Sequence, residues 1–405
     1  MTPAARVQAA IGILDAWLAD AGQLDRQLAA WGRQNRYAGS KDRHAIADLV
    51  WDAIRCRRSA AWAAGVDEDS ATGRDLIRGR FLADGADPGD FFCGGRYGPA
   101  PLSASEQQPV RETATAPRAV RLDYPDWMEP HLANICDTSL EKLRGRASLD
   151  LRVNTLKASQ DDAIASLAEE DIETEPVNGV PTALRVLTRP RGVRSSVAYR
   201  DGLVEIQDAA SQAVAGMAAC QPGETVLDLC CGGGGKTLAM AAMMKGEGRL
   251  IAHDINPERT RDLPDRAQRA GALVKLIASH DLDGLKGRCD VVVADVPCSG
   301  SGAWRRNPDA RWMLSPEQLI RFGRTQREIL KQALQLCAPN GRVLYATCSI
   351  IKAENEDVVD ACLQDLGDWQ LDEQASLSPG APGDGFFGSL LRPSLTKARP
   401  FSRKD

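Results

Sequence analysis

The first part of the chain has the apolar spacing of packed helices. Its apolar residues recur every three or four positions, as on one face of a helix, at Val7, Ala10, Ile11, Leu14, Trp17 and Leu18 and again at Leu24, Leu28 and Trp31. Ser40 is a preferred capping residue and predicts the start of a third helix through Ile46 and Ile54. The pattern therefore predicts an all-helical domain over residues 1–83.

Two less regular stretches follow this helical part. Residues 84–121 are rich in Gly, Pro, Ser and Gln, a composition that predicts a linker. Residues 122–201 have a mixed pattern, which predicts a small α+β segment. Within it, residues 150–157 alternate polar and apolar side chains, so we expect a strand with its polar side in a groove.

From about residue 202 short apolar runs alternate with helical stretches. The runs stand at 225–229, 249–253, 274–278, 290–294 and 342–346, and the clearest helical stretches at 236–244 and 316–336. This alternation is typical of a Rossmann-like α/β fold with a mostly parallel sheet, here predicted over residues 202–395. Residues 383–392 could add an edge hairpin, and 396–405 are left as a tail.

A glycine-rich loop follows the first of these strands. Residues 225–237 read Thr-Val-Leu-Asp-Leu-Cys-Cys-Gly-Gly-Gly-Gly-Lys-Thr, a strand that enters four glycines and then a helix. A Walker A loop would need glycine at Cys230, and the dinucleotide fingerprint would need glycine at Thr237, so both fail on spacing. The remaining interpretations are a nucleoside ligand with its amino-acid end at the loop, or a plain tight turn.

Acidic residues follow three further strands. Asp254, Asp281 and Asp295 each come directly after an apolar run. Because the carboxyl ends of parallel strands meet at one edge of a sheet, these side chains are expected to converge on a ligand crevice. The position of Asp254, roughly 20 residues beyond the glycine loop, is where a ribose is commonly held.

Charge and cysteine content limit the setting in which the protein works. The net charge of −5 argues against a basic coat over the whole protein, although a local basic face could still bind a polyanion. The eleven cysteines include no Cys-x-x-Cys pair, and the four histidines have no zinc-ligand spacing. We therefore expect reduced thiols, a cytoplasmic location, no signal peptide, no membrane span and no metal.

Two cysteines stand in a different setting from the rest. Residues 295–302 read Asp-Val-Pro-Cys-Ser-Gly-Ser-Gly, and residues 345–349 read Tyr-Ala-Thr-Cys-Ser. Each segment places its cysteine, Cys298 or Cys348, just past a predicted strand and on the edge that carries the glycine loop. A lone cysteine is usually a small buried apolar residue, but these two lie in polar loops that face the expected ligand.

From about residue 150 onward the chain resembles the Sun-domain RNA (cytosine-5) methyltransferases of the RsmB type. The matching segments are 152–157, 207–212, the glycine loop, 295–302, 305–309, 347–349 and 354–356. Residues 1–80, with Ala-Gly-Ser-Lys-Asp-Arg at 38–43, look like the NusB-like RNA-binding domain of some members. The family usually has Ala-Ala-Pro where this chain has Cys231, Gly232 and Gly233, and Ala in place of Val296. The first departure predicts a looser loop.

The resemblance implies a class I methyltransferase with S-adenosyl-L-methionine as cofactor. It implies that Cys348 attacks cytosine C6, that Cys298 assists release, that Asp295 holds the base and that Lys236 orders loop and substrate. A cysteine suits the first step because it is the strongest nucleophile near neutral pH. The implied cofactor contacts are Cys230, Cys231, Gly232, Gly233, Gly234, Gly235, Lys236, Asp254, Asp281 and Asp295.

The implied partner is RNA, most simply small-subunit ribosomal RNA, bound by a monomer. Two alternatives stay open: transfer RNA as substrate, and a ribosome-assembly factor that binds RNA without methylating it. Two basic sets could contact the RNA. The first follows the Cys298 loop, with Trp304 and Trp312 among Arg305, Arg306, Arg311, Arg321, Arg324, Arg327 and Lys331. The second lies near the N-terminus, at Arg33, Arg36, Lys41, Arg43, Arg55, Arg57 and Arg58.

Overall fold

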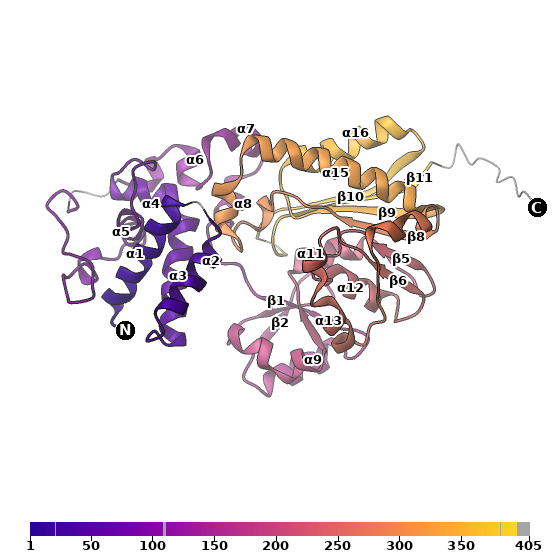
Figure 1. Ribbon diagram of the computed structural model, residues 1–405, viewed down its shortest axis with the longest axis horizontal. Coiled ribbons are helices and arrows are strands. Elements are labelled where there is room, and N and C mark those ends of the chain that lie inside the picture. Colours follow the sequence, from indigo (N-terminus) through magenta and orange to yellow (C-terminus); the bar gives the residue numbers. More distant parts are fainter. Residues whose placement is uncertain (21, 108–110, 381, 395–405) are drawn as a thin grey trace, which may run out of the picture. The chain divides into compact units, whose positions relative to one another are not determined.

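The computed structural model describes residues 1–20, 22–107, 111–380 and 382–394, and the expected tail at 396–405 lies outside these ranges. The chain forms two compact units (Figure 1). Unit 1 comprises residues 1–146 together with 304–314, and unit 2 comprises 147–303 and 315–405. These limits differ from the expected domain boundaries, because 84–121 and 122–146 both belong to unit 1.

Unit 1 is built on the helices that the apolar spacing predicts. They are α1 (Pro3–Ala19), α2 (Leu24–Gln34), α3 (Ser40–Arg55), α4 (Arg57–Ala64) and α5 (Gly73–Ala83). The predicted positions Ile11, Leu14 and Ile46 are buried in one shared core. Ser40 is the first residue of α3 and Gly39 is its N-cap, so the predicted cap was wrong by one residue.

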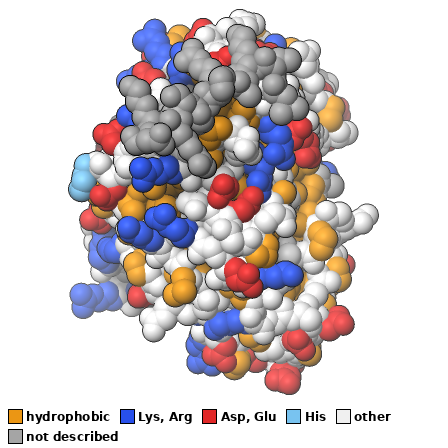
Figure 2. Space-filling model, turned by 90° about the vertical axis from the view of Figure 1, so that its right-hand side faces the viewer, with side chains coloured by type: hydrophobic (Ala, Val, Ile, Leu, Met, Phe, Trp, Pro, Cys, Tyr) orange, Lys and Arg blue, Asp and Glu red, His pale blue; other side chains and the backbone are white. Residues whose placement is uncertain are grey.

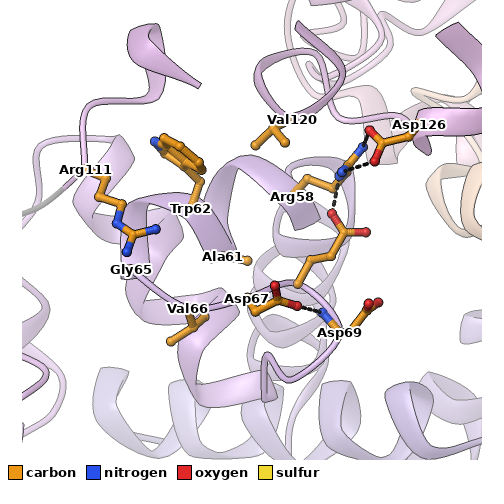
Figure 3. A pocket seen from close by; sticks show the side chains of 11 residues that line it. Arg58, Ala61, Trp62, Gly65, Val66, Asp67, Asp69, Arg111, Val120 and Asp126 are labelled. Atoms are coloured by element: carbon orange, nitrogen blue, oxygen red, sulfur yellow. Dashed lines mark hydrogen bonds and ion pairs between the residues drawn. The ribbon is translucent and has the colours of Figure 1, made fainter. Parts of the chain in front are cut away.

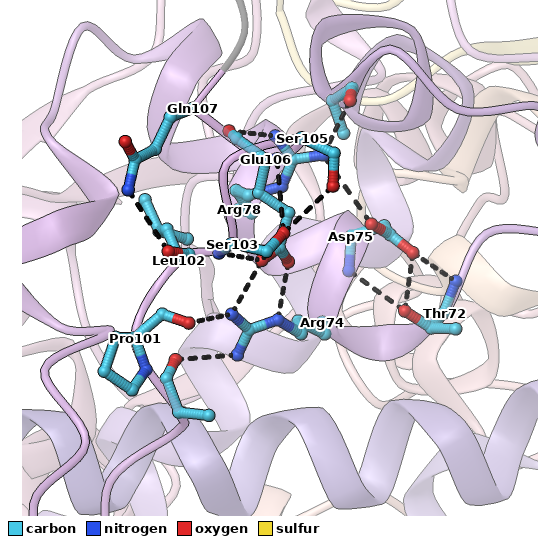
Figure 4. Close-up of polar contacts among 12 residues, drawn as sticks. Thr72, Arg74, Asp75, Arg78, Pro101, Leu102, Ser103, Ser105, Glu106 and Gln107 are labelled. Carbon is cyan, nitrogen blue, oxygen red and sulfur yellow. Dashed lines mark hydrogen bonds and ion pairs between the residues drawn. The ribbon is translucent and has the colours of Figure 1, made fainter.

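Described residues of the stretch 84–121 pack against this helical core. Phe92 is buried among the core side chains, and Phe81 stacks on Phe91 with ring centroids 4.6 Å apart. Arg74 of α5 ties the segment down through Glu106, at 2.6 Å, and through the carbonyl oxygen of Ala100 (Figure 4). The stretch is low in regular structure as its composition predicts, but it is part of unit 1.

Short helical turns complete unit 1. They are η1 (Pro88–Asp90), η2 (Thr113–Thr115), α6 (Arg118–Arg121), η3 (Asp126–Met128), α7 (Glu129–Leu132), α8 (Asp137–Lys142) and α14 (Pro308–Met313). In α14, Arg311 is 1% exposed and donates to the carbonyl oxygens of Asp123 and Leu143. Its guanidinium lies 4.9 Å from the ring centre of Trp304, which is also buried.

The expectation that the stretch after Cys298 tracks RNA was therefore wrong for Trp304, Arg305 and Arg311. All three are buried in unit 1, and the indole of Trp312 donates to the carbonyl oxygen of Ile54. An arginine-rich, tryptophan-rich run has the same composition whether it binds RNA or fills a core, so composition did not distinguish the two. Arg321, Arg324 and Arg327 of α15 are exposed, as a solvated helix face requires.

Unit 2 begins with a small antiparallel sheet in the order β2-β3-β1-β4. Its elements are β1 (Asp150–Val153), α9 (Gln160–Ala168), β2 (Thr174–Pro176), β3 (Ala183–Val186), η4 (Pro190–Ser195), α10 (Val197–Arg200) and β4 (Val204–Ile206). All four residues of β1 are buried, so the expected polar groove was wrong. Arg185 neutralises Asp150 at 2.9 Å, which lets the carboxylate stay inside.

The large sheet has the order β10-β11-β9-β8-β5-β6-β7. Strands β5 (Thr225–Asp228), β6 (Arg249–Ala252), β7 (Lys275–Leu276), β8 (Cys289–Asp295) and β9 (Cys337–Thr347) are parallel, and β10 (Trp369–Leu377) and β11 (Phe386–Pro393) form an antiparallel hairpin at one side. The mostly parallel Rossmann-like fold that the alternation predicts is confirmed.

Helices cover both faces of this sheet (Figure 1). They are α11 (Ala209–Gly216), α12 (Gly235–Met243), α13 (Leu263–Ala270), α15 (Pro316–Leu336) and α16 (Glu356–Leu366), with turns η5 (Pro257–Thr260), η6 (Ser279–Leu285), η7 (Ser301–Ala303) and η8 (Lys352–Glu354). Neighbouring strand residues Val291 and Val292 point into opposite cores, one with α12 and one with α15. In the described ranges the structure has no helix long and apolar enough to cross a membrane.

Candidate active site

Four parallel strands end side by side and present polar residues at one edge. Asp228 ends β5 and Asp295 ends β8, while Asp254 follows β6 by two residues and Cys348 follows β9 directly. Asp295 is opposite Ala346 of β9 in the strand register, which places the Cys298 and Cys348 loops next to each other. Asp281, in η6 after β7, makes local contacts: it accepts a hydrogen bond from the backbone N of Ala278 and remains half exposed.

The glycine loop after β5 is held by several hydrogen bonds. Gly234 is in the left-handed region at φ +83°, and a Cβ there would lie 2.2 Å from Leu263, so the position requires glycine. The backbone N of Gly232 donates to Asp254 at 2.9 Å, and Arg266 donates to the carbonyl oxygen of Gly233. These contacts restrain a loop that its composition predicted to be loose.

Three buried polar atoms around this loop have no hydrogen-bond partner in the described residues. They are Asp228 Oδ1, Gln207 Oε1 and Arg152 Nε. Arg152 also donates to the carbonyl oxygen of Gly235 at 3.2 Å, and a Cβ on Gly235 would lie 3.7 Å from the amide of Gln207. Because buried polar groups normally have partners, these atoms fit a polar ligand at the loop, such as the methionine end of the expected cofactor.

Burial controls the ionisation of Asp228. Its carboxyl group is fully buried and accepts a hydrogen bond from the Thr237 hydroxyl at 2.6 Å. Burial, with a smaller contribution from the charge of Asp295, raises the pKa of Asp228 to about 7 against the opposing effect of the Thr237 hydrogen bond. This carboxyl group is therefore poised to change charge near neutral pH.

Lys236, which is buried, and Asp295, which is partly exposed, form an ion pair beside the cysteines. The Lys236 ammonium lies 2.8 Å from Asp295 Oδ2 and 5.1 Å from the ring centre of Phe386. Burial alone would lower the pKa of Lys236, but Asp295 outweighs it and the pKa is raised. The lysine therefore stays charged and fixes the carboxylate at the end of β8.

The sulfurs of Cys298 and Cys348 lie 3.4 Å apart. The contact with Cys348, burial and the charge of Glu354 all raise the pKa of the Cys298 thiol well above its ordinary value. Cys298 therefore keeps its proton at neutral pH and can donate it toward Cys348. Burial also raises the pKa of Cys230, and that of Cys231 to about 12, so neither loop cysteine is suited to act as a thiolate.

A buried glutamate joins the two cysteine loops. Glu354 is 0% exposed; its Oε1 accepts from the backbone N of Ser299 at 2.8 Å, and its Oε2 accepts from the Ser349 hydroxyl at 2.6 Å. Gln326 of α15 donates both to Glu354 and to the carbonyl oxygen of Pro297. The position of each sulfur thus depends on one carboxylate.

Sequence reasoning did not place Glu354, Gln326 or Asp228 in the site. Glu354 was noted only as part of a matching segment, and Asp228 only as a strand residue. Asp228 carried an available signal, because it stands between Leu227 and Leu229 and a carboxyl group in an apolar strand is buried only when it has partners. Glu354 and Gln326 stand among polar and charged residues, and their local sequence gave no such signal.

The structure buries some residues of the N-terminal basic set and exposes others. Arg58 is buried and bonded to Glu68 and Asp126 in a pocket that also contains Asp67 and Asp69 (Figure 3). Arg55 is buried and paired with Asp52. These two were wrongly expected to reach RNA, whereas Arg33, Arg36, Lys41 and Arg43 are exposed. On the face drawn in Figure 2, basic and acidic side chains are interspersed among the described residues, in keeping with the small net charge.

The fold and the strand-end site define a class I methyltransferase fold, and solved structures share it. A methyltransferase homologue from Pyrococcus horikoshii superposes with a TM-score of 0.60 at 24% identity, covering 68% of this chain and 98% of that one. NSun6 from the same organism, solved with SFG, gives a TM-score of 0.59 at 18% identity, covering 66% and 97%. At these identities the likeness shows the fold alone.

Sequence comparison then identifies the family. The 16S rRNA methyltransferase RsmB/F family matches residues 215–386, and the ferredoxin-like domain of RsmF/B-like methyltransferases matches 124–194. A protein of Sodalis glossinidius named "Ribosomal RNA small subunit methyltransferase B" is 31% identical, covering 72% of this chain and 68% of its own length. The chain therefore belongs to the RsmB/F methyltransferase family, which confirms the resemblance and supports S-adenosyl-L-methionine as the cofactor.

The matches cover only part of each relative's length. A Synechocystis protein named "Probable ribosomal RNA small subunit methyltransferase B" is 35% identical over 60% of this chain, and the match spans 56% of that protein. The chain thus spans between about half and two thirds of the length of these relatives.

The Asp228 carboxyl group predicts a pH-dependent stability. Its pKa is raised from 3.8 to about 7 on folding. The contribution of Asp228 to the free energy of unfolding is therefore fully present below about pH 4 and is lost as pH rises through 7. Relative to Asp228→Asn, the wild-type free energy of unfolding should fall by up to about 4 kcal/mol over this window. Urea unfolding of the cofactor-free protein from pH 4 to 8 measures this. Asp262→Asn, at an exposed site, is the control, and parallel curves for Asp228→Asn and wild type would contradict the assignment.

The contacts of Glu354 predict that this residue controls how closely the sulfurs of Cys298 and Cys348 are held. Glu354→Gln removes the negative charge and turns one acceptor oxygen into a donor, so the charge-assisted hydrogen bonds to the Ser299 backbone N and the Ser349 hydroxyl are weakened. We expect diamide to form the Cys298–Cys348 disulfide about tenfold more slowly, because small displacements have large effects on rate. Mass spectrometry of quenched samples measures this. The control is Glu356→Gln, two residues further on and partly exposed, which should form the disulfide at the wild-type rate. An unchanged rate in Glu354→Gln would show that Glu354 is not needed to position the two cysteine loops.

Proposed function

We propose that this chain is an S-adenosyl-L-methionine-dependent RNA methyltransferase that forms 5-methylcytosine, with small-subunit ribosomal RNA as substrate. The pair of sulfurs 3.4 Å apart, beside the Lys236–Asp295 ion pair, is the observation that carries the proposal. The names of the relatives favour ribosomal RNA over transfer RNA. An assembly factor that only binds RNA would have no need for two thiols held in contact.

The chemistry begins with Cys348. Cytosine C5 is a weak nucleophile, so the Cys348 thiolate adds to C6: its electron pair forms the S–C6 bond, and the C5=C6 π electrons become available at C5. Cys298 supports this step by donating its proton toward the Cys348 sulfur. Asp295, fixed by Lys236, holds the polar edge of the base. The base must first be unstacked, which favours a loop or a single-stranded target.

S-adenosyl-L-methionine supplies the methyl group when bound, and the glycine loop with Asp228 and Asp254 would hold it. After methylation, C5 has lost its nucleophilic pair and carries both methyl and hydrogen. Removal of the C5 proton returns an electron pair to the ring, re-forms C5=C6 and breaks the S–C6 bond, releasing Cys348 as thiolate.

Electrostatics explains why Cys298 serves at this late stage. Part of the rise in its pKa comes from the charge and hydrogen bonding of Cys348. Once the Cys348 sulfur is a neutral thioether, that part disappears and the pKa of Cys298 falls. Cys298 then loses its own proton to solvent water and, as a thiolate, accepts the C5 proton. At the end of the cycle both cysteines have returned to their starting protonation states, and one proton has been released to solvent.

The domain roles complete the proposal. The methyltransferase segment 202–395 carries the chemistry, residues 122–201 contribute to RNA binding, and the NusB-like helices within 1–83 of unit 1 add affinity. Bisulfite sequencing of total RNA from a deletion strain tests the substrate. One unmethylated cytosine in small-subunit ribosomal RNA is the expected result, and one in transfer RNA would select the alternative.

The two thiols predict opposite mutant phenotypes. Cys348→Ala should abolish both methyl transfer and covalent complex, because no adduct can form. Cys298→Ala should methylate once and then stall, which leaves protein joined to RNA as a slow band on a denaturing gel. Cys93→Ala, at an exposed site in unit 1, is the control. A trapped band from Cys348→Ala alone would reverse the assignment, and full activity in both variants would end the covalent mechanism.

The position of Asp254 predicts that this residue contributes to the affinity for the cofactor. Its carboxylate is buried at the end of β6, where it accepts hydrogen bonds from the backbone N of Gly232 and of Asn256. Asp254→Ala should weaken S-adenosyl-L-methionine binding by about 1–3 kcal/mol, the scale for lost charged hydrogen bonds. Calorimetry measures this, with the exposed Asp283→Ala as the matched control. Unchanged affinity would remove Asp254 from the cofactor site.

A further inference from the structure

Unit 1 has an aromatic cavity that the proposed chemistry does not use. The cavity, of about 850 Å³, lies between α1, the end of α2 and the segment around residue 97. Its aromatic lining residues are Trp31, Tyr37 and Tyr97, and polar groups come from Gln8 and Arg96. We call it the aromatic pocket.

Two of the three aromatic rings are exposed to solvent. Tyr37 is 73% exposed and Tyr97 is 66% exposed, while Trp31 packs its inner side on the helical core. The Arg96 guanidinium lies 5.1 Å from the ring centre of Tyr97. Exposed apolar side chains that are gathered around one cavity, unlike single scattered ones, mark a binding site.

Exposed cations lie on the elements that border the aromatic pocket. Arg33 is on α2, Arg36 is in the turn that follows, and Lys41 is in the first turn of α3. The described residues include no ion pair for these three side chains. The acidic neighbour Asp42 is already neutralised by Arg6 at 2.8 Å, so the local positive charge is uncompensated.

We propose that the aromatic pocket binds a nucleobase of single-stranded RNA, while Arg33, Arg36 and Lys41 contact the adjoining phosphates. Aromatic rings stack on any base, and flanking cations follow the backbone, which together make a platform for single strands. Arg96 is placed to add a cation–π contact. The inference rests on the proposed function in one respect, namely that the substrate is RNA.

The test measures binding of two fluorescein-labelled RNAs to the full chain without methyl donor. One is a twelve-nucleotide oligoadenylate, and the other has abasic nucleotides at its four central positions. Wild type should prefer the RNA with all its bases. Tyr37→Ala/Tyr97→Ala should weaken binding of the complete RNA by about tenfold and leave the abasic RNA almost unaffected, because only stacking is removed.

Matched variants separate stacking from charge. Tyr37→Phe/Tyr97→Phe keeps the rings and should bind as wild type does. Arg33→Gln/Arg36→Gln should weaken both RNAs alike and reduce the slope of affinity against salt, because fewer counterions are released. Both tyrosines are largely exposed, so thermal unfolding should be unchanged.

Three outcomes would overturn the inference. The first is wild-type affinity for the complete RNA in Tyr37→Ala/Tyr97→Ala. The second is that Tyr37→Phe/Tyr97→Phe weakens binding as much as the double alanine variant does. The third is a changed oligomeric state of the double alanine variant in sedimentation, which would make the pocket a protein contact. Failure of the proposed function is distinguishable, because it would appear as absent methyl transfer by the wild type. Binding of the two RNAs is measured without that reaction.

Discussion

The parallel pairing of β8 between β5 and β9 is the constraint on which the candidate site depends. Parallel strands end at the same edge, so residues that are 50 positions apart in sequence, Cys298 and Cys348, come within 3.4 Å. Valine-rich strands with helices on both faces fix this pairing through two hydrophobic cores. The reacting groups sit on loops, but the loops begin on a rigid sheet.

Buried charge gives the site its chemical character. Asp295 is paired with Lys236, Asp228 accepts a hydrogen bond from the neutral Thr237 hydroxyl, and Glu354 accepts hydrogen bonds from neutral donors. Each arrangement has a different result: a fixed ion pair, a carboxyl group that titrates near neutrality, and an anchor for two loops. Desolvation makes each of them stronger than it would be in water.

The sequence indicated the fold class and the reactive residues because both depend on local patterns. Helix α15 was predicted at its observed ends, and four of the five parallel strands at or within two residues of theirs, because the spacing of apolar residues reports which side chains are buried. Strand β9 begins at Cys337, five residues before the predicted start. Cys298 and Cys348 stood out because polar residues follow apolar strands. The contact between their sulfurs could not be predicted from the sequence, because it depends on the order of strands in the sheet.

What the tertiary structure alone decided is how each charged residue is used. Arg311 and Arg36 look equivalent in sequence, yet one is enclosed by Trp304 and backbone carbonyls while the other is exposed to solvent. Glu354 and Glu356 are two residues apart, and only the first ties the cysteine loops together. The sequence by itself determined the strands, the glycine loop and the two thiols, because local periodicity encodes them. Packing decided which charges are enclosed, because burial depends on partners distant along the chain.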